Sequence, residues 1–243
     1  MGELRIVLLE NPGPADPLFR RVAAMREAGY RLRHPAVALH ADPYDAISTH
    51  ALVCAECSGA LEPLMCFRST RTRACDAAGL PFPLVPALEL KRWPEHAAAL
   101  DQELEAHRRD VSYMGSWTTA PELRHDRPLL HRVLARTGAL LVGLVRDHGA
   151  GHIVGAALPN TERLLARYGI RALATLPPLP VTYLPGELAV IVRLEEFSDA
   201  ALTEARDARA DWDRRLVLPS IEIAATRTRN PQDEPERALQ PRI

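Results

Sequence analysis

The 243-residue sequence lacks the features that mark several large classes of protein. Lys91 is its one lysine, and its 30 basic residues are balanced by 31 acidic ones, giving a net charge of −1. A chain without excess positive charge does not have the electrostatic character of a nucleic-acid-binding protein. It contains no apolar run of 18 or more residues, so we expect no membrane span. The N-terminus does not have the layout of a signal peptide, and we expect a cytoplasmic protein.

Cysteine is also scarce. Four cysteines, Cys54, Cys57, Cys66 and Cys75, are too few for a disulfide scaffold in a chain of this size. Cys54 and Cys57 have the spacing of half a zinc knuckle, but the other two lie too far apart to supply the second half. We therefore expect reduced cysteines at core or edge positions and no metal site.

Three common nucleotide-binding and hydrolase motifs are missing. There is no G-x-G-x-x-G, no G-x-x-x-x-G-K-[ST] and no G-x-S-x-G, so the corresponding folds lose support. The content of 47% hydrophobic and 25% charged residues is nevertheless ordinary for a chain that buries a core. We expect one domain over residues 1–220 and a flexible tail over 221–243, where prolines and charges show no apolar period.

The hydrophobic periodicity predicts a mixed order of strands and helices. Asp16 and Pro17 are typical of a helix start, and Gly29 of a helix end. Pro63 indicates an edge strand or a bulge. Strands are predicted at 4–9, 50–57, 61–67, 111–119, 152–158, 181–184 and 188–194, and helices at 17–29, 94–109, 127–145, 159–168 and 198–215.

This order of elements resembles the GNAT acyltransferase fold over about residues 3–195. The resemblance implies a mixed α/β (α+β) architecture, with a central twisted mixed sheet whose fourth and fifth strands splay apart between flanking helices. The front half is similar to the acyl-homoserine lactone (autoinducer) synthases and the related N-acyl amino acid synthases. Four features carry that similarity: Arg26 late in the first helix, Asp42-Pro43-Tyr44-Asp45 matching a D-x-Y-D motif, Arg68 at the end of the third strand, and Gly151–Gly155 followed by Arg167-Tyr168-Gly169-Ile170.

The residue types suit an amino-acid acceptor. An arginine presents a planar fork of donors to a carboxylate, which suits Arg26 and Arg68. Asp42 and Asp45 would bind the ammonium group or orient the two arginines. The alternatives are that the D-P-Y-D segment is a plain Asx turn and that Arg26 is a solvated helix residue. The resemblance implies an enzyme that moves an acyl group from acyl carrier protein or acyl-CoA, as co-substrate, to a small-molecule amine, with no permanently bound cofactor.

The sequence departs from the autoinducer-synthase pattern E-x-S-R-F. The matching stretch is Met114-Gly115-Ser116-Trp117-Thr118, so a methionine replaces the acid and Trp117 replaces the arginine. We assign Trp117 to substrate binding and Ser116 to protonation of the leaving thiolate. With the family acid missing, a water molecule, Asp45 or Glu122 would help to deprotonate the amine, whose pKa is roughly 8.

The acyl-donor loop departs from its pattern as well. Acetyl-CoA-using GNAT enzymes share an R-x-x-G-x-G/A loop that holds pyrophosphate at a helix N-terminus. Here Arg124 fits the first position, but Arg127 and Leu129 replace the glycines and Pro128 lacks an N–H. This favours a donor on an acyl carrier protein, which an arginine-rich face with Arg124, Arg127, Arg132 and Arg136 would suit. The alternative is a solvated helix face.

Two other functions remain open. One is an acyl-homoserine lactone synthase that uses S-adenosylmethionine, and the other is a GNAT-like binding module without catalysis. The sequence leaves the acyl chain length, the amine acceptor and the oligomeric state undetermined. His125, His131, His148 and His152 show no metal-ligand or catalytic-triad spacing, so we expect surface or core histidines.

Overall fold

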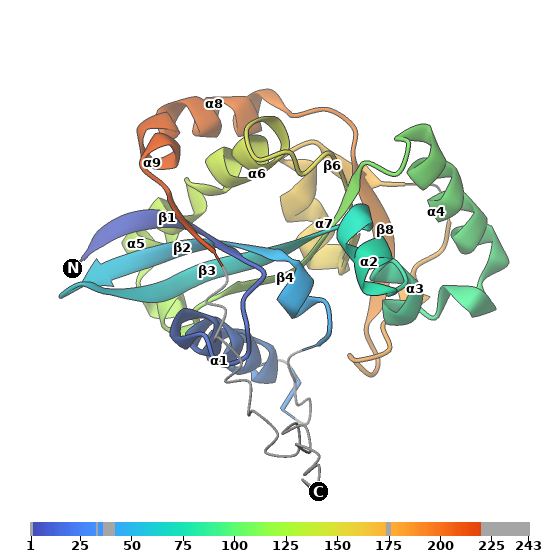
Figure 1. The fold of residues 1–243 in the computed structure, drawn as a ribbon, viewed down its shortest axis with the longest axis horizontal. Helices are drawn as coiled ribbons and strands as arrows, with labels where there is room; N and C mark the ends of the chain where they lie inside the picture. The colour runs from blue at the N-terminus through green and yellow to red at the C-terminus, as the bar shows by residue number, and fades with distance from the viewer. Residues whose placement is uncertain (1, 33, 36–41, 174–175, 220–243) are drawn as a thin grey trace, which may run out of the picture.

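The computed structural model describes residues 2–32, 34–35, 42–173 and 176–219. Its strands are β1 (Glu3–Glu10), β2 (Thr49–Cys57), β3 (Ala60–Arg71), β4 (Val111–Thr119), β5 (His152–Ala157), β6 (Ile170–Ala172), β7 (Leu179–Pro180), β8 (Leu188–Leu194) and β9 (Leu216–Leu218). They form one mixed sheet in the order β6-β8-β5-β4-β3-β2-β1-β9, and β7 also pairs with β8 (Figure 1). The predicted fold class, a mixed sheet flanked by helices, is confirmed.

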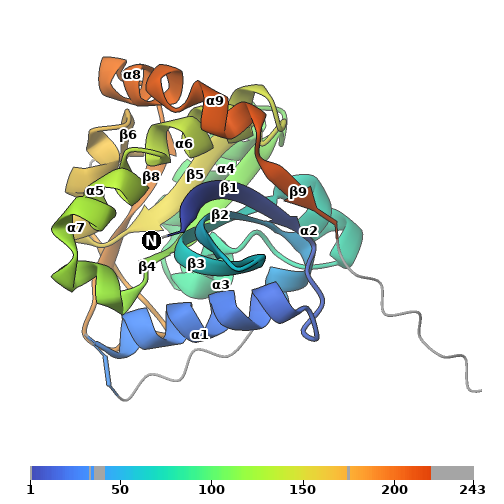
Figure 2. The ribbon, with the colours of Figure 1, turned by 90° about the vertical axis from the view of Figure 1, so that its left-hand side faces the viewer.

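Helices cover both faces of the sheet. The α-helices are α1 (Pro17–Arg31), α2 (Thr72–Ala78), α3 (Leu84–Ala87), α4 (Pro94–Ala106), α5 (Arg127–Leu134), α6 (Thr137–Arg146), α7 (Pro159–Ala166), α8 (Asp199–Asp207) and α9 (Arg209–Asp213). The 3₁₀ helices are η1 (Asp45–Ile47), η2 (Leu90–Arg92) and η3 (Pro121–His125). Figure 2 shows α1 below the sheet and α6, α8 and α9 above it. Helix α1 packs against β3 and β4, which places its inner face beside the site described below.

The hairpin of β2 and β3 forms as predicted. Ser58 and Gly59 turn the chain with positive φ angles of 52° and 79°, as the tight hairpin turn requires. The register then shifts, because Val53 pairs with Met65 while Cys54 pairs with Pro63. The predicted irregularity at Pro63 is therefore a bulge inside the sheet, and the strand that carries it is not an edge strand.

Helix α1 begins as predicted and ends later than predicted. The Asp16 carboxylate accepts hydrogen bonds from the backbone N–H groups of Leu18 and Phe19 at 2.8 and 2.9 Å, and Pro17 occupies the first turn. The helix continues past Gly29 to Arg31. A Cβ atom at Gly29 would lie 2.4 Å from Cγ2 of Thr118. Glycine at this position therefore permits close contact between α1 and β4 and does not end the helix.

Three other predicted elements differ from the structure. The helix predicted over 127–145 is divided into α5 and α6 by a turn, and the one predicted over 198–215 is divided into α8 and α9. The strand predicted at 181–184 is wrong, because the Thr182 N–H bonds to the carbonyl of Ala87 and the segment turns back. Strands β6 and β7 pair with β8 instead. The predicted tail, 221–243, lies outside the described residues.

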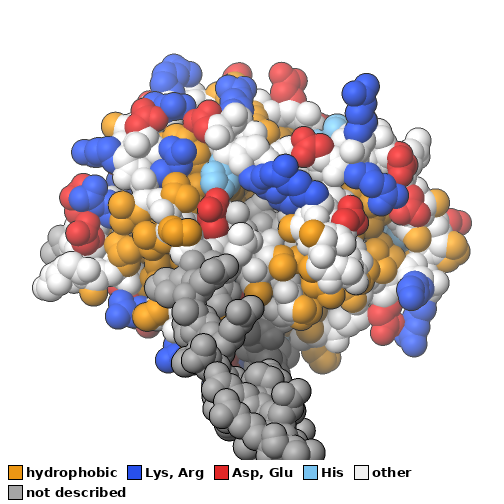
Figure 3. All heavy atoms as spheres, viewed as in Figure 1, with side chains coloured by type: hydrophobic (Ala, Val, Ile, Leu, Met, Phe, Trp, Pro, Cys, Tyr) orange, Lys and Arg blue, Asp and Glu red, His pale blue; other side chains and the backbone are white. Residues whose placement is uncertain are grey.

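One described segment, Arg127–Arg146, is long and apolar enough to cross a membrane by length and composition alone. Half of that window is buried against the rest of the protein, as in a core helix. The α6 part is almost wholly enclosed, from Thr137 to Leu144. On the face seen in Figure 3, acidic and basic side chains are interspersed rather than gathered by sign.

Strands β4 and β5 separate in the middle of the sheet, as the resemblance implied. Their parallel pairing runs from Val111 with His152 to Met114 with Gly155 and then ends. Beyond that point β4 continues beside β3 as far as Thr119, and β5 continues beside β8. The strands therefore open a gap whose walls begin at Gly115 and Ala156, and both residues line a cavity described below.

Candidate active site

The structure brings together the four charged residues that the sequence singled out. Asp45 Oδ1 lies 2.8 Å from Nη1 of Arg26 on α1 and 2.8 Å from Nη1 of Arg68 on β3. The same Nη1 atom of Arg68 lies 2.6 Å from Oδ1 of Asp42. Two helices and a strand therefore converge on one network of alternating charge. Neither arginine is a solvated residue, since Arg26 is 7% exposed and Arg68 is 4% exposed.

Asp45 is an enclosed carboxylate. It is 2% exposed, and its second oxygen, Oδ2, accepts from the backbone N–H of Asp42. Burial raises the pKa of Asp45, but the positive charges of Arg26 and Arg68 outweigh burial and hold the pKa below its usual value. A carboxylate whose oxygens are occupied and whose pKa is low is a poor proton acceptor. Asp45 therefore holds the two arginines in place, and the assignment of a general base to it is not supported.

Asp42 both forms an Asx turn and holds an arginine, the two roles that its sequence pattern suggested. Its Oδ1 atom accepts from the backbone N–H groups of Tyr44 and Asp45, which is the Asx turn, and also from Arg68. The Tyr44 hydroxyl donates to the carbonyl of Pro81 at 3.0 Å and ties this turn to the chain after α2. The Asp42 side chain is 40% exposed, so it is the carboxylate of the network that a ligand can reach.

His50 on β2 contacts the charged network through the backbone of Asp45. The sequence did not indicate this residue. It pairs across the sheet with Arg68, and its Nε2 atom lies 3.1 Å from the Asp45 carbonyl oxygen. Burial lowers the pKa of His50 to about 4, with the charge on Asp45 opposing that shift. The ring is therefore neutral at pH 7, and Nε2–H donates to the carbonyl. A histidine at the start of an apolar strand is a weak signal, because core histidines show the same pattern.

The charged network lines a cavity of about 280 Å³, here named the polar cavity. Arg26, Asp42 and Arg68 form its charged wall, and Tyr44, Pro83, Pro86, Ala87 and Thr182 are among its other lining residues. The Nε atoms of both arginines are buried without a hydrogen-bond partner among the described residues. The described residues thus leave two buried N–H groups of the network without a partner, as in a site that completes its contacts with a ligand.

A second cavity, of about 360 Å³, lies where β4 and β5 separate and is named the cleft cavity. Its lining is mostly apolar and comes from β4, β5, α5 and α7, and includes Met114, Trp117, Leu130, Leu134, Ala156, Leu158, Leu164 and Leu165. Trp117, predicted to bind substrate, stacks on Phe67 with ring centroids 5.2 Å apart and 26° between the planes. A mostly apolar lining of this kind suits an apolar ligand or part of one.

The two cavities share a wall. Tyr30, Tyr113, Ser116 and Tyr183 line both of them. Ser116 has a positive φ of 58° and lies in a bulge, because Arg68 pairs with Gly115 while Cys66 pairs with Thr118. Burial raises the pKa of Tyr113 above its usual range, so its hydroxyl remains a proton donor. The sequence identified Ser116 but missed all three tyrosines, since their elements meet only in the folded protein.

The remaining predicted residues lie at the surface. Glu122 is exposed on η3 and lines neither cavity, so the base assigned to it is not supported by its position. Arg124 is exposed and reaches the cleft cavity, whereas Arg127 and Arg132 are exposed on α5. Asp126 accepts from the N–H of Leu129 at 2.9 Å. A protein carboxylate therefore already occupies the N-terminus of α5.

Comparison with known proteins identifies the fold. No family model matches the sequence, and no curated protein is recognisably similar to it. The solved structure of BjaI, a CoA-dependent acyl-homoserine lactone synthase with SAM and isopentyl-CoA, matches with a TM-score of 0.55 and 12% identity over 89% of this chain and 93% of that chain. TofI, in a ternary complex with an inhibitor and MTA, matches with a TM-score of 0.52 and 14% identity over 83% and 96% of the two chains.

These similarities establish the class of fold. The chain has the GNAT-like mixed α+β fold found in the acyl-homoserine lactone synthase BjaI. The predicted resemblance is confirmed at that level, and the splayed strands that define the fold also carry the cleft cavity. At 12–14% identity the match describes the scaffold, and the chemistry has to be argued from the side chains of this chain.

Proposed function

We propose that this protein is an N-acyltransferase that moves an acyl group from a thioester to the amine of an amino acid or related small molecule. The observation that carries the proposal is the shared wall between the polar cavity and the cleft cavity. A charged acceptor bound in the first cavity and an acyl thioester bound in the second meet at Ser116 and Tyr113. Reactions between two bound molecules gain most of their rate from such positioning.

The acceptor site suits a group that carries both an amine and a carboxylate. Among the described residues, Arg26 and Arg68 contact the aspartates through Nη1, which leaves the Nη2 edge of each guanidinium for a substrate carboxylate. Asp42 is the one carboxylate among the described residues that line the two cavities. Its hydrogen bonds from described residues end at Oδ1, which leaves Oδ2 for the substrate ammonium. The network carries two positive and two negative charges, and a zwitterion leaves that balance unchanged.

The donor is proposed to be an acyl chain on an acyl carrier protein, with acyl-CoA as the alternative. The capped N-terminus of α5, with Pro128 in its first turn, offers few free N–H groups to a pyrophosphate. Arg124 at the mouth of the cleft cavity, together with Arg127 and Arg132 on α5, is suited to an acidic carrier. Arg136 is paired with Asp211 at 2.7 Å and belongs to the packing of α6 and α9.

The reaction is a direct attack of the amine nitrogen on the thioester carbonyl carbon. The ammonium first gives up a proton, to Asp42 or to water, and needs modest help because its pKa is roughly 8. Backbone N–H groups where β4 and β5 separate stabilise the tetrahedral oxyanion. The carbon–sulfur bond then breaks as the amide forms. The thiolate takes a proton from the hydroxyl of Ser116 or Tyr113, which both line the shared wall, and that oxygen regains a proton from the second one that the attacking nitrogen loses.

The test is mass spectrometry of reactions that contain a pool of amino acids and either acyl-CoA or acyl carrier protein. We expect an acyl amide whose formation at limiting amine concentration falls at least tenfold in Asp42→Asn and is unchanged in the control Glu122→Gln, because Glu122 lies outside both cavities. An amide formed equally well by Asp42→Asn would exclude the acceptor site. No product with either donor from the folded protein would favour the non-catalytic module.

The second candidate is an acyl-homoserine lactone synthase that uses S-adenosylmethionine. The match to BjaI, solved with SAM and isopentyl-CoA, is what supports it. Met114 and Trp117 in place of the acid and arginine of that family argue against it. Adding S-adenosylmethionine to the same reactions separates the two, because an acyl-homoserine lactone would appear only under the second candidate.

A further inference from the structure

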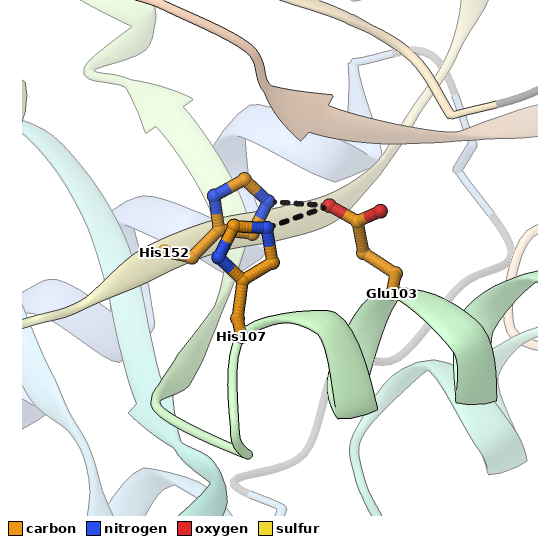
Figure 4. Close-up of side chains that lie close together, drawn as sticks. All are labelled: Glu103, His107 and His152. Carbon is orange, nitrogen blue, oxygen red and sulfur yellow. Dashed lines mark ion pairs between the residues drawn. The ribbon is translucent and has the colours of Figure 1, made fainter.

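A compact cluster of two histidines and a glutamate lies outside both cavities. Glu103 and His107 are one helical turn apart at the end of α4, and His152 is the first residue of β5. Figure 4 shows both imidazole rings directed at the same carboxylate. Glu103 Oε1 lies 2.7 Å from Nε2 of His152 and 3.4 Å from Nε2 of His107. The rings are stacked, with centroids 3.6 Å apart and 3° between their planes.

The ligand atoms of this cluster lack ordinary partners. Glu103 is 5% exposed, yet its Oε1 atom forms no hydrogen bond of normal geometry with a described residue. The same holds for Nε2 of His152, although the two atoms are 2.7 Å apart. A carboxylate oxygen and an imidazole lone pair repel each other at that distance unless a proton or a cation lies between them.

We propose that Glu103, His107 and His152 bind a divalent transition-metal ion of the zinc type. Two imidazole nitrogens and one carboxylate oxygen form a ligand set that zinc accepts, with the fourth position left to water. The side chain of His107 is 38% exposed, so an ion can enter from solvent past this ring. All three ligand atoms already lie within 4.8 Å of one another.

The separations between the ligand atoms are close to those of a zinc site. Zinc binds imidazole nitrogen at about 2.0–2.1 Å in tetrahedral sites, so two ligand atoms on the same ion lie roughly 3.3 Å apart. The separations of 2.7 and 3.4 Å from Glu103 Oε1 bracket that value. The rings are parallel to within 3°, so both must rotate before their Nε2 lone pairs, which lie in the ring planes, point to one ion beside Oε1.

Charged neighbours of Glu103 orient its carboxylate toward the histidines. Arg193 on β8 lies 2.8 Å from Glu103 Oε2 and so leaves Oε1 as the oxygen that faces the histidines, as outer partners of metal ligands commonly do. Glu195 lies 3.7 Å from the same guanidinium and offsets part of its charge.

The proposed metal site is separate from the two cavities proposed for acyl transfer. None of its three ligands lines either cavity. Its ligands join α4 to the start of β5, the strand that pairs with β4 only as far as Gly155. A bound ion would therefore fasten the helix to the strand that forms one side of the cleft, and we expect it to stabilise the folded protein.

The experiment is a titration of the full chain, stripped with a chelator, with zinc chloride alone, followed by calorimetry and by thermal unfolding. We expect one zinc ion per chain and a rise in the unfolding temperature. His107→Gln is the main variant, since its partly exposed side chain can be replaced without emptying the core. We expect its zinc affinity to fall at least tenfold. The matched control is His131→Gln, an exposed histidine on α5.

The alternative is that both rings donate Nε2–H to Glu103 and no ion binds. Zinc binding of equal strength in the wild type and in His107→Gln would overturn the proposal, as would no binding at all. Cobalt in place of zinc adds a spectroscopic readout. We expect visible absorption bands of a tetrahedral ion that are lost in Glu103→Gln and retained in His131→Gln. Neither readout depends on acyl transfer.

Discussion

The Nη1 atom of Arg68 lies 2.8 Å from Oδ1 of Asp45, and both side chains are almost fully buried. The same nitrogen lies 2.6 Å from Oδ1 of Asp42, which is half-buried and lines the polar cavity. One guanidinium thus joins an enclosed anion to an accessible one. Asp45 positions the arginines, and Asp42 presents charge to a ligand.

Asp45→Asn is expected to destabilise the protein by about 3–5 kcal/mol, since removing one partner of a buried ion pair leaves the other charge uncompensated. In this variant two buried guanidinium groups, those of Arg26 and Arg68, would lose their shared anion. Urea unfolding at pH 7 measures the effect. Asp42→Asn is the control and is expected to change stability less than Asp45→Asn does, because the Asp42 side chain is 40% exposed and Arg68 keeps its ion pair with Asp45. Equal stability of the two variants would contradict the roles assigned here.

Asp42→Asn is expected to raise the KM for the amine roughly tenfold or more, equivalent to about 1.4 kcal/mol of binding. The KM for the acyl donor is expected to stay unchanged, because Asp42 does not line the cleft cavity. Steady-state kinetics with each substrate varied in turn tests this. A change confined to the donor KM would show that the two cavities have been assigned the wrong way round.

Ala156→Leu is expected to shift donor preference toward shorter acyl chains. Ala156 lines the cleft cavity on the β5 side, and the larger side chain fills space for about three carbons. Each methylene excluded from an apolar site costs about 0.8 kcal/mol, so a chain that overfills the cavity loses roughly fourfold in kcat/KM per carbon. Competition among acyl donors of increasing length measures the preference. An unchanged preference would place the acyl chain elsewhere.

Gly29→Ala tests the close approach of α1 to β4. Alanine favours a helix over glycine by about 1 kcal/mol, but the new Cβ would lie 2.4 Å from Cγ2 of Thr118. We expect a net loss of about 1–3 kcal/mol, as for other overpacked positions. Adding Thr118→Ser removes that methyl group and is expected to restore stability. Gly13→Ala, where a Cβ meets nothing within 4 Å, is the control.

His50 makes stability depend on pH. Its pKa is about 4 in the folded protein against roughly 6.5 in the unfolded chain. The unfolded state therefore binds more protons between these values, and stability falls as pH drops from about 6.5 to 4. The expected loss is roughly 3 kcal/mol at 1.36 kcal/mol per pKa unit. His50→Gln should lack this component in urea unfolding at pH 7 and pH 4.5. The same slope in both proteins would exclude His50 as its source.

Much of the fold could be predicted from capping, turn and proline residues in short stretches of the sequence. Asp16 and Pro17 start α1, Ser58 and Gly59 turn the hairpin, and Pro63 interrupts its register. Predictions failed where packing overrode a local signal. Gly29 resembles a helix end but serves a contact with Thr118, and Val181–Leu184 resembles a strand although Thr182 bonds to the carbonyl of Ala87 instead.

The sequence by itself determined the start of α1, the β2–β3 hairpin and most of the other strands, because those signals lie in short stretches of chain, and its resemblance to a known family singled out the four charged residues. The tertiary structure alone decided that Asp45 is enclosed while Asp42 is accessible, that three tyrosines and Ser116 separate two cavities, and that His152 meets His107 and Glu103. Glu103 and His152 are far apart along the chain, and their contact depends on how α4 packs beside the start of β5. Sheet register and helix packing, which no local pattern specifies, bring such residues together.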